Sequence, residues 1–142
     1  MRLQAYPPST PLLSDIEFLL PSTTKSSTEI DGIKVIPCPF DALPRNRPLY
    51  VYWEMYNLTQ DGDGNTKYKS QVLLTPGDSA PGDESRVVYE KDHVGQNEFA
   101  TEFAQIDVRD YDEGTYTLTV QITDRLMVHT FLKSRAVKLT GD

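Results

Sequence analysis

The sequence predicts an all-β fold, an immunoglobulin-like or fibronectin III-like antiparallel β-sandwich of about seven to nine strands in one domain. Three segments predict it: the strictly alternating Thr115–Thr123, the aromatic Leu49–Leu58, and a corner-like turn over Asp112–Leu118. No window of useful length combines the 3.6-residue apolar period of a helix with capping residues. The length of 142 residues lies within the range of a single domain, so residues 1–142 are expected to share one core.

Thr115–Thr123 is the clearest strand of the sequence. Every second residue in it is apolar, namely Tyr116, Leu118, Val120 and Ile122. Threonine and glutamine fill the positions between them. Because side chains alternate between the two faces of a strand, this pattern predicts one buried face and one solvated face.

Leu49–Leu58 is dense in aromatic and β-branched residues, which favour strands. Its alternation predicts two rows of side chains, one of Leu49, Val51, Trp53 and Met55 and the other of Tyr50, Tyr52, Glu54 and Tyr56. Both rows are largely apolar, which is typical of a central strand. The Asp-Gly and Gly-Asn pairs that follow predict a turn, with Thr66–Leu74 returning as the hairpin partner.

The turn before Thr115 resembles the D-x-G-x-Y-x-C motif of immunoglobulin-type domains, with Asp112, Gly114 and Tyr116 at the matching positions. In that motif the tyrosine hydroxyl bonds back to the preceding loop. Leu118 stands where the disulfide cysteine would be, and Trp53 is the candidate for the buried indole between the sheets. We expect these five residues to have structural roles.

Composition excludes several functional classes. The net charge of −7 argues against nucleic-acid binding, because phosphate contacts need clustered lysine and arginine. No segment approaches the roughly 20 apolar residues of a spanning helix, so direct membrane insertion is not expected. Cys38 is the single cysteine, so the sandwich has no intrachain disulfide.

No set of catalytic residues is visible, and we expect neither an enzyme nor a cofactor. The two histidines, His93 in a predicted loop and His129 in a predicted strand, have no paired cysteines with which to form a zinc site. No G-x-S-x-G context supports a Ser–His–Asp triad.

One turn has a weak resemblance to a calcium loop. Asp61, Asp63 and Asn65 match the front half of an EF-hand loop, but its sixth and twelfth positions are Thr66 and Val72 instead of glycine and glutamate. Asp-Gly and Gly-Asn are also ordinary hairpin residues. No metal is therefore expected, with a surface-turn calcium site as the alternative.

The tyrosine row is the feature that suggests binding. Tyr50, Tyr52 and Tyr56 share one face, and Tyr68 lies on the predicted partner strand. Tyrosine is enriched at interfaces because it joins apolar area to a polar tip, and its ring can also stack on sugars. The alternative, which we favour, is that this row packs against the second sheet.

The start of the chain reads as strand and connectors. Met1–Tyr6 is strand-like and is not a signal peptide, so we expect the domain to be excised from a longer protein. Pro7–Ser14 and Pro21–Thr28 are rich in proline, serine and threonine and are expected to connect elements within residues 1–28.

Three segments together resemble a known family: LSDIEFL (13–19), PLYVYWEMYNLTQDGDGNTKYKSQVLL (48–74) and YDEGTYTLTVQITD (111–124). They are similar to the C-terminal β-sandwich region of bacterial GWxTD-domain proteins, which are mostly exported and of uncharacterised function. The Gly-Trp-x-Thr-Asp motif itself is absent. The resemblance implies a sandwich downstream of that motif and transfers no catalytic residue.

Three functions follow as hypotheses. The first is a non-catalytic accessory or protein-interaction domain of an exported bacterial protein, extracytoplasmic, with a protein or another domain of the parent chain as its partner. A cytoplasmic location stays open. The second is a carbohydrate-binding module that uses the tyrosine row, and the third is a small hydrolase.

Overall fold

The chain folds into strands only, in the part that the computed structural model describes: residues 11–21, 28–30, 32–38, 42–77, 82 and 84–141. This confirms the all-β class, with eleven strands in that part where about seven to nine were predicted. None of the described residues forms a helix able to cross a membrane. The predicted strand Met1–Tyr6 and much of the two proline-rich connectors lie outside the described residues.

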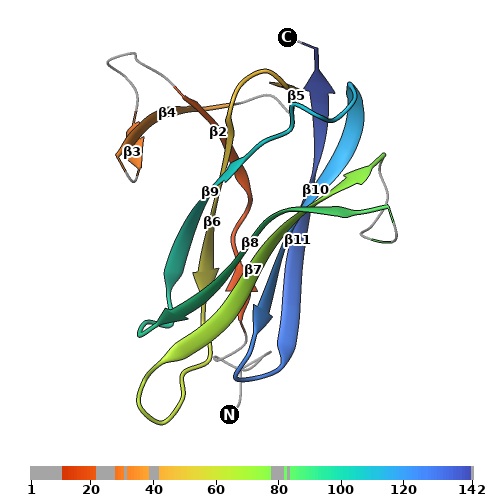
Figure 1. Cartoon of the computed structure of the whole chain (residues 1–142). Helices are drawn as coiled ribbons and strands as arrows, with labels where there is room; N and C mark the ends of the chain where they lie inside the picture. The colour runs from red at the N-terminus through yellow and green to blue at the C-terminus, as the bar shows by residue number, and fades with distance from the viewer. Residues whose placement is uncertain are drawn as a thin grey trace, which may run out of the picture.

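Two curled sheets face each other (Figure 1). The first sheet contains β1 (Leu12–Leu13), β2 (Glu17–Pro21), β3 (Thr28–Ile30), β4 (Ile33–Pro37), β6 (Leu49–Tyr56) and β9 (Ala100–Ile106). The second contains β5 (Ala42–Pro44), β7 (Thr66–Pro76), β8 (Arg86–Gly95), β10 (Gly114–Asp124) and β11 (His129–Thr140). The single cysteine, Cys38, is a buried free thiol, so no disulfide joins the sheets.

In the first sheet β6 is central. Met55 pairs with Ala100 of β9 on one side and with Leu13 of β1 on the other, and β2 continues along the β1 side toward β4 and β3. The second sheet runs β5-β11-β10-β7-β8 and is antiparallel except for the parallel pair β5 and β11. In each sheet, some strands therefore pair with strands that are distant in sequence.

The predicted hairpin between Leu49–Leu58 and Thr66–Leu74 is wrong. β6 belongs to the first sheet and β7 to the second, and the chain crosses between layers through residues 57–65 (Figure 1). The physical reason is that each strand has one row of buried side chains, which includes Trp53 on β6 and Val72 on β7. Both rows become buried when the strands face each other across the core instead of pairing edge to edge.

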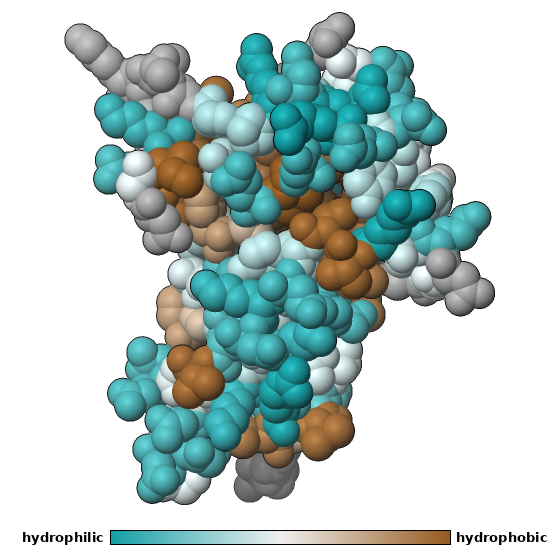
Figure 2. Space-filling view, in the orientation of Figure 1, coloured by the Kyte–Doolittle hydropathy of each residue, from teal (hydrophilic) through white to brown (hydrophobic). Residues whose placement is uncertain are grey.

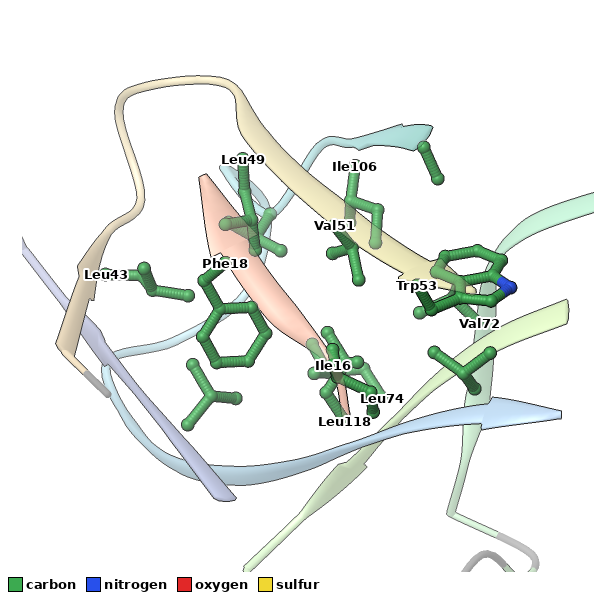
Figure 3. Close-up of a cluster of buried hydrophobic side chains, with 14 of the residues drawn as sticks. Ile16, Phe18, Leu43, Leu49, Val51, Trp53, Val72, Leu74, Ile106 and Leu118 are labelled. Atoms are coloured by element: carbon green, nitrogen blue, oxygen red, sulfur yellow. The ribbon is translucent and has the colours of Figure 1, made fainter. Parts of the chain in front are cut away.

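The core fills the space between the sheets with the predicted apolar rows (Figure 3). Leu118, Val120 and Ile122 of β10 are buried, and Trp53 is fully buried. Leu49, Val51, Trp53 and Met55 point into this core, so the tyrosine row of β6 points away from the second sheet. The interpretation that we favoured from sequence, with the tyrosine row against the second sheet, is therefore wrong.

The corner before β10 is confirmed. The Tyr116 hydroxyl donates a hydrogen bond of 2.8 Å to the Asp112 carbonyl oxygen. Gly114 has φ +147°, which other residues rarely adopt. The bond satisfies a buried hydroxyl and holds the 108–113 loop against the start of β10.

β8 is longer than the strand Arg86–Glu90 that the sequence predicts. β8 extends to Gly95, so His93 lies in a strand instead of a loop. Lys91 of β8 pairs with the buried Ser70, which places it in the row directed toward the other sheet, yet its side chain is exposed because β8 is an edge strand. The sequence predicts a last strand over Met127–Leu132 and Ala136–Leu139 that can bend around Lys133–Arg135. β11 is instead one unbroken strand from His129 to Thr140, in which His129–Leu139 pair with β10.

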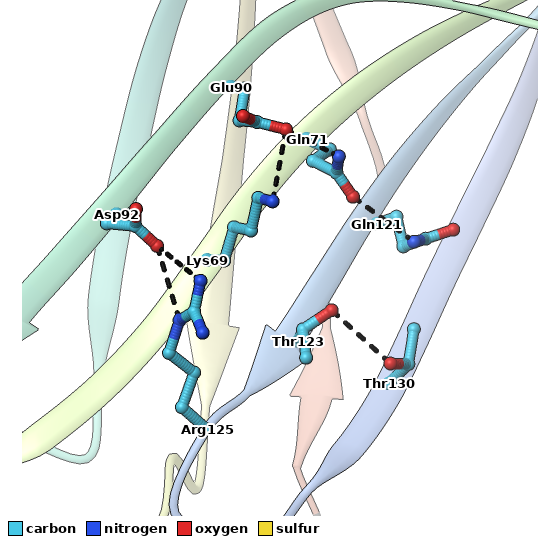
Figure 4. A network of polar contacts seen from close by, with 8 residues as sticks. All are labelled: Lys69, Gln71, Glu90, Asp92, Gln121, Thr123, Arg125 and Thr130. Atoms are coloured by element: carbon cyan, nitrogen blue, oxygen red, sulfur yellow. Dashed lines mark hydrogen bonds and ion pairs between the residues drawn. The ribbon is translucent and has the colours of Figure 1, made fainter.

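The outer face of the second sheet is polar. Gln71 donates to Glu90 over 2.7 Å, Lys69 pairs with the same carboxylate, and Arg125 pairs with Asp92 over 2.9 Å (Figure 4). The polar row predicted for Thr115–Thr123 lies on this face, but it is only partly solvated, because Thr119 in it is buried. The polar face distinguishes the second sheet from the aromatic outer face of the first.

Candidate functional site

Aromatic side chains cross the outer face of the first sheet. We call this surface the aromatic strip: Tyr52, Glu54, Tyr56, Phe99, Thr101 and Phe103. Tyr52 pairs with Phe103 across β6 and β9, and Glu54 pairs with Thr101. The rings of Tyr56 and Phe99 are tilted against each other with centroids 5.3 Å apart. The strip thus has one ring pair on each side of the polar pair formed by Glu54 and Thr101.

Glu54 fixes the tyrosines of the strip. Tyr52 donates to Glu54 Oε2 over 3.0 Å, and Tyr56 donates to Glu54 Oε1. Burial, followed by the bond to Glu54, raises the pKa of Tyr52, and the bond to Glu54, followed by burial, raises the pKa of Tyr56. Both hydroxyls therefore remain protonated donors, and their rings are held in fixed positions on the sheet.

The other two predicted tyrosines lie elsewhere. Tyr50 is buried beside the strip, and its ring stacks on Phe103 with centroids 4.9 Å apart and planes 8° apart. It belongs to a small second core on this face, formed with Leu19 and Val35. Tyr68 is on β7 and points into the space between the sheets, because β6 and β7 are not hairpin partners. Of the four tyrosines named from sequence as a binding candidate, only Tyr52 and Tyr56 lie on the strip, beside Phe99 and Phe103.

A buried carboxylate joins the two sheets at the seam between β8 and β9. Glu102 on β9 is only 6% exposed. It accepts hydrogen bonds from Ser70 Oγ at 2.6 Å and from the Tyr89 hydroxyl at 2.5 Å, and it lies 2.9 Å from His93 Nε2. All three partners come from the second sheet, so this Glu102 cluster is a polar link between the layers.

Aromatic rings enclose the Glu102 cluster. Tyr68 stacks on His93 with centroids 4.6 Å apart, and Trp53 meets Tyr89 edge to face at 6.3 Å. Trp53 Nε1 is the one buried side-chain polar atom without a hydrogen-bond partner in the described part of the chain. The Glu102 carboxylate is enclosed and its oxygens already accept hydrogen bonds. The arrangement is therefore typical of a structural hydrogen-bond network and not of an acid–base pair that a substrate could reach.

The seam tyrosines predict a loss of stability in alkali. Burial and the nearby Glu102 carboxylate raise the pKa of Tyr68 to about 12, and burial and its bond to Glu102 raise that of Tyr89 still further. Since the folded-state pKa exceeds the unfolded value near 10, the contribution is complete below pH 10 and is lost as the pH rises toward 12. Urea midpoints measured between pH 8 and about 11.5 should therefore fall, and Tyr68→Phe should make the fall shallower.

An equally steep fall in the Tyr68→Phe variant would contradict this assignment. Tyr111 is a suitable comparison, because burial raises its pKa although it does not belong to the Glu102 cluster. Tyr111→Phe should leave unchanged the part of the fall in urea midpoint with pH that depends on Glu102.

The predicted calcium turn is held by its own carboxylate. Asp61 Oδ1 accepts the backbone N–H groups of Asn65 at 3.0 Å and Asp63 at 2.9 Å, which lowers the pKa of Asp61. One of its oxygens is thus engaged by the backbone, as in ordinary turns. Among the described residues, no three histidine, cysteine, aspartate or glutamate side chains lie close enough to hold a metal ion.

Sequence reasoning missed the Glu102 cluster and the phenylalanines of the strip. The signal for Glu102 was its place in the row of Ala104 and Ile106, both of which are buried. A glutamate in such a row is either solvated at an edge or paired inside, and the sequence does not name the donors, which come from two other strands.

Comparisons with known proteins give little further identity. No protein-family model matches the chain, and no curated protein matches it. Among solved structures, the chain is similar to part of a β-glucosidase from Listeria innocua, solved in complex with glucose, with 16% sequence identity and a TM-score of 0.49. The match covers 90% of this chain and 16% of that chain, so this chain spans less than one fifth of its length.

Proposed function

We propose that the chain is a non-catalytic accessory domain of immunoglobulin-like topology that binds a partner protein through the aromatic strip. The strip carries the proposal. It is an aromatic surface on an outer sheet face, and Phe99 in it is half exposed. Aromatic residues are enriched at protein interfaces, where they supply rigid contact area with few rotatable bonds.

The strand order supports the immunoglobulin-like part of the proposal. The antiparallel run β2-β6-β9 faces the antiparallel run β11-β10-β7-β8, and the chain crosses between the layers after β4, β5, β6, β8 and β9. The tyrosine corner precedes β10, as in that class. A packed core with Leu118 and Trp53 replaces the disulfide.

The resemblance to GWxTD-domain proteins supports the context of the proposal. Two of the similar segments contain β6, most of β7, and β10, which build the centre of both sheets. An exported bacterial parent protein and an extracytoplasmic location belong to this proposal. The gene sequence of the parent chain tests it, and an intact parent with neither an export signal nor an upstream Gly-Trp-x-Thr-Asp motif would contradict it.

A carbohydrate-binding module is the second candidate, and the polar pair of the strip favours it. Glu54 and Thr101 lie between the two ring pairs, so a chain of sugars could stack on rings while its hydroxyl groups reach polar atoms. Both carboxylate oxygens of Glu54 already accept tyrosine hydroxyls, which reduces the capacity left for a glycan.

Capture experiments with matched variants test the proposal. Purified wild-type chain, a Tyr52→Ala/Phe103→Ala variant and a Leu132→Ala control should be immobilised and exposed to extract of the source cells. The strip variant is expected to lose a defined partner by at least about tenfold, because truncating interface aromatics costs 1–2 kcal/mol or more each. The control removes exposed apolar area from the second sheet and should retain the partner.

Glycan titrations separate the two candidates. Soluble neutral polysaccharides added to the wild-type chain should produce no saturable change in tyrosine or Trp53 fluorescence under the main proposal. Saturable binding that the strip variant loses would support the carbohydrate module and overturn protein binding by the strip.

A further inference from the structure

A hollow opens at one end of the aromatic strip. It holds about 230 Å³ and lies between the β5–β6 connection, residues 45–48, and the segment that leaves β9. Figure 1 places both segments at the upper end of the molecule, where Figure 2 shows mainly teal, hydrophilic side chains. We call it the Arg47 hollow, and its lining includes Asn46, Arg47, Pro48, Gln105, Asp107 and Arg109.

The hollow continues the row of side chains on the β9 side of the strip. Thr101, Phe103 and Gln105 occupy alternate positions of β9, so they share the outer face of the sheet, and Phe99 precedes them by two residues. Gln105 is exposed and lines the hollow. Because a strand rises about 3.3 Å per residue, the row from Phe99 to Gln105 is about 20 Å long. An extended chain of about seven residues therefore spans the strip and ends in the hollow.

Arg47 supplies the excess charge of the hollow. Asp107 accepts hydrogen bonds from Arg109 on both carboxylate oxygens, over 3.0 and 2.8 Å, and this pairing lowers the pKa of Asp107 to about 2. The charges of Asp107 and Arg109 therefore cancel. Arg47 is exposed and has no hydrogen bond or ion pair with any residue that the structure describes. The lining thus carries one excess positive charge in a chain whose net charge is −7.

The neighbouring Arg45 differs from Arg47 because the fold uses it. Arg45 Nη1 donates to the Tyr111 carbonyl oxygen over 2.6 Å, and Arg45 Nη2 lies 3.8 Å from a carboxylate oxygen of Glu113. Arg45 thereby holds the 108–113 loop beside the β5–β6 connection. Arg47 makes no comparable contact in the described part of the chain, so it can be replaced without loss of a bond within the fold.

The chemistry of the hollow suits a carboxylate at the end of a chain. A guanidinium group pairs with a carboxylate through two parallel hydrogen bonds. Asn46 and Gln105, both exposed, place amide donors in the same lining. The volume is smaller than the roughly 300–1,000 Å³ of sites that enclose a whole small molecule. The hollow therefore fits one terminal residue, while the rest of the ligand lies outside it along the strip.

The ring pairs define where the ligand needs apolar side chains. The Tyr56–Phe99 and Tyr52–Phe103 pairs are four positions apart along β9, and Gln105 is two positions further toward the hollow. A polypeptide extended alongside β9 rises by about the same distance per residue. Its apolar side chains would therefore lie two and six positions before the terminal residue.

We propose that the aromatic strip and the Arg47 hollow together bind the carboxyl terminus of a partner polypeptide. The terminal carboxylate pairs with Arg47, and two apolar side chains of the extended segment pack on the two ring pairs. Because this names the part of the partner protein that the strip binds, it rests on the proposed function.

Two synthetic peptides that differ only at their ends test the proposal. Both are N-acetylated and seven residues long, with leucine at the first and fifth positions and threonine elsewhere; one ends in a free carboxylate and the other in a carboxamide. Added to the ¹⁵N-labelled full chain, the free acid should shift the backbone amides of 46–48 and 99–109 and bind about tenfold tighter than the carboxamide. The net charge of −7 acts in the opposite direction, because it repels only the acid.

Matched variants assign the preference for the acid to the hollow. Arg47→Gln should abolish that preference and leave the melting temperature unchanged. Arg86→Gln makes the same change at an exposed arginine of the second sheet and should retain the preference. A free-acid peptide with its leucines moved to the second and sixth positions should bind more weakly, because its apolar side chains no longer meet the ring pairs.

Four outcomes would overturn the proposal: equal binding of acid and carboxamide, no binding of either, a preference for the acid that survives Arg47→Gln, or saturable binding of a soluble oligogalacturonate but not of the peptide. In the first three cases protein binding by the strip would still stand if the Tyr52→Ala/Phe103→Ala variant lost its captured partner. The failure of this proposal is therefore distinguishable from the failure of the proposed function.

Discussion

Leu118→Asp is expected to unfold the domain. Leu118 is buried in the middle of β10, between β7 and β11, and its side chain meets the core that also contains Trp53. The substitution removes a large apolar side chain and leaves a carboxylate without donors, a combination that costs more than about 4 kcal/mol. Domains of this size have about 5–15 kcal/mol of stability in total.

The single tryptophan, Trp53, gives the readout. Urea unfolding followed by its fluorescence should show the Leu118→Asp variant unfolded, or with a midpoint close to zero denaturant. Leu132→Asp is the matched control, because Leu132 is on the neighbouring strand but is exposed. Equal midpoints for Leu118→Asp and wild type would show that Leu118 does not face the core.

Glu102→Ala is the second substitution with a large expected effect. It leaves the Ser70 and Tyr89 hydroxyls and His93 without their acceptor at a buried seam. Loss of one partner from a buried charged network costs about 3 kcal/mol, more than the hydrogen bonds would contribute at the surface. A shift of the urea midpoint with an unchanged slope would measure it.

Graded variants separate the charge from the hydrogen bonds. Glu102→Gln keeps one acceptor oxygen and should give an intermediate loss. Glu90→Ala removes an exposed carboxylate that bonds Gln71 and Lys69, and it should leave the midpoint nearly unchanged (Figure 4). If Glu102→Ala matched Glu90→Ala, the seam would not depend on the buried carboxylate.

The sequence was sufficient for the class of fold and for individual strands. The period-two pattern over Thr115–Thr123 identified the buried row of β10, and the D-x-G-x-Y spacing identified the Tyr116 corner. Both are local patterns, in which the residues that reveal the structure are a few positions apart. The buried indole of Trp53 was also expected and found.

Strand partners and the polar seam could not be predicted in the same way. Alternation shows that β6 and β7 each have a buried row, but it does not show whether the strands pair in one sheet or face each other across two. Glu102 depends on Ser70 and Tyr89, which are 32 and 13 positions away. A buried carboxylate is defined by such distant donors, so a lone glutamate in an apolar row was not recognisable as a network.

Lys91 has a consequence for the behaviour of concentrated solutions. An unpaired strand at a sheet margin offers its free N–H and C=O groups to strands of other molecules, and a charge directed inward at that margin is a known safeguard against such growth. Lys91 has this position on β8, where it lies in the inward row while its side chain stays in water. An incoming strand would have to bury that ammonium group, so the charge that adds little to folding protects the domain from forming ordered aggregates.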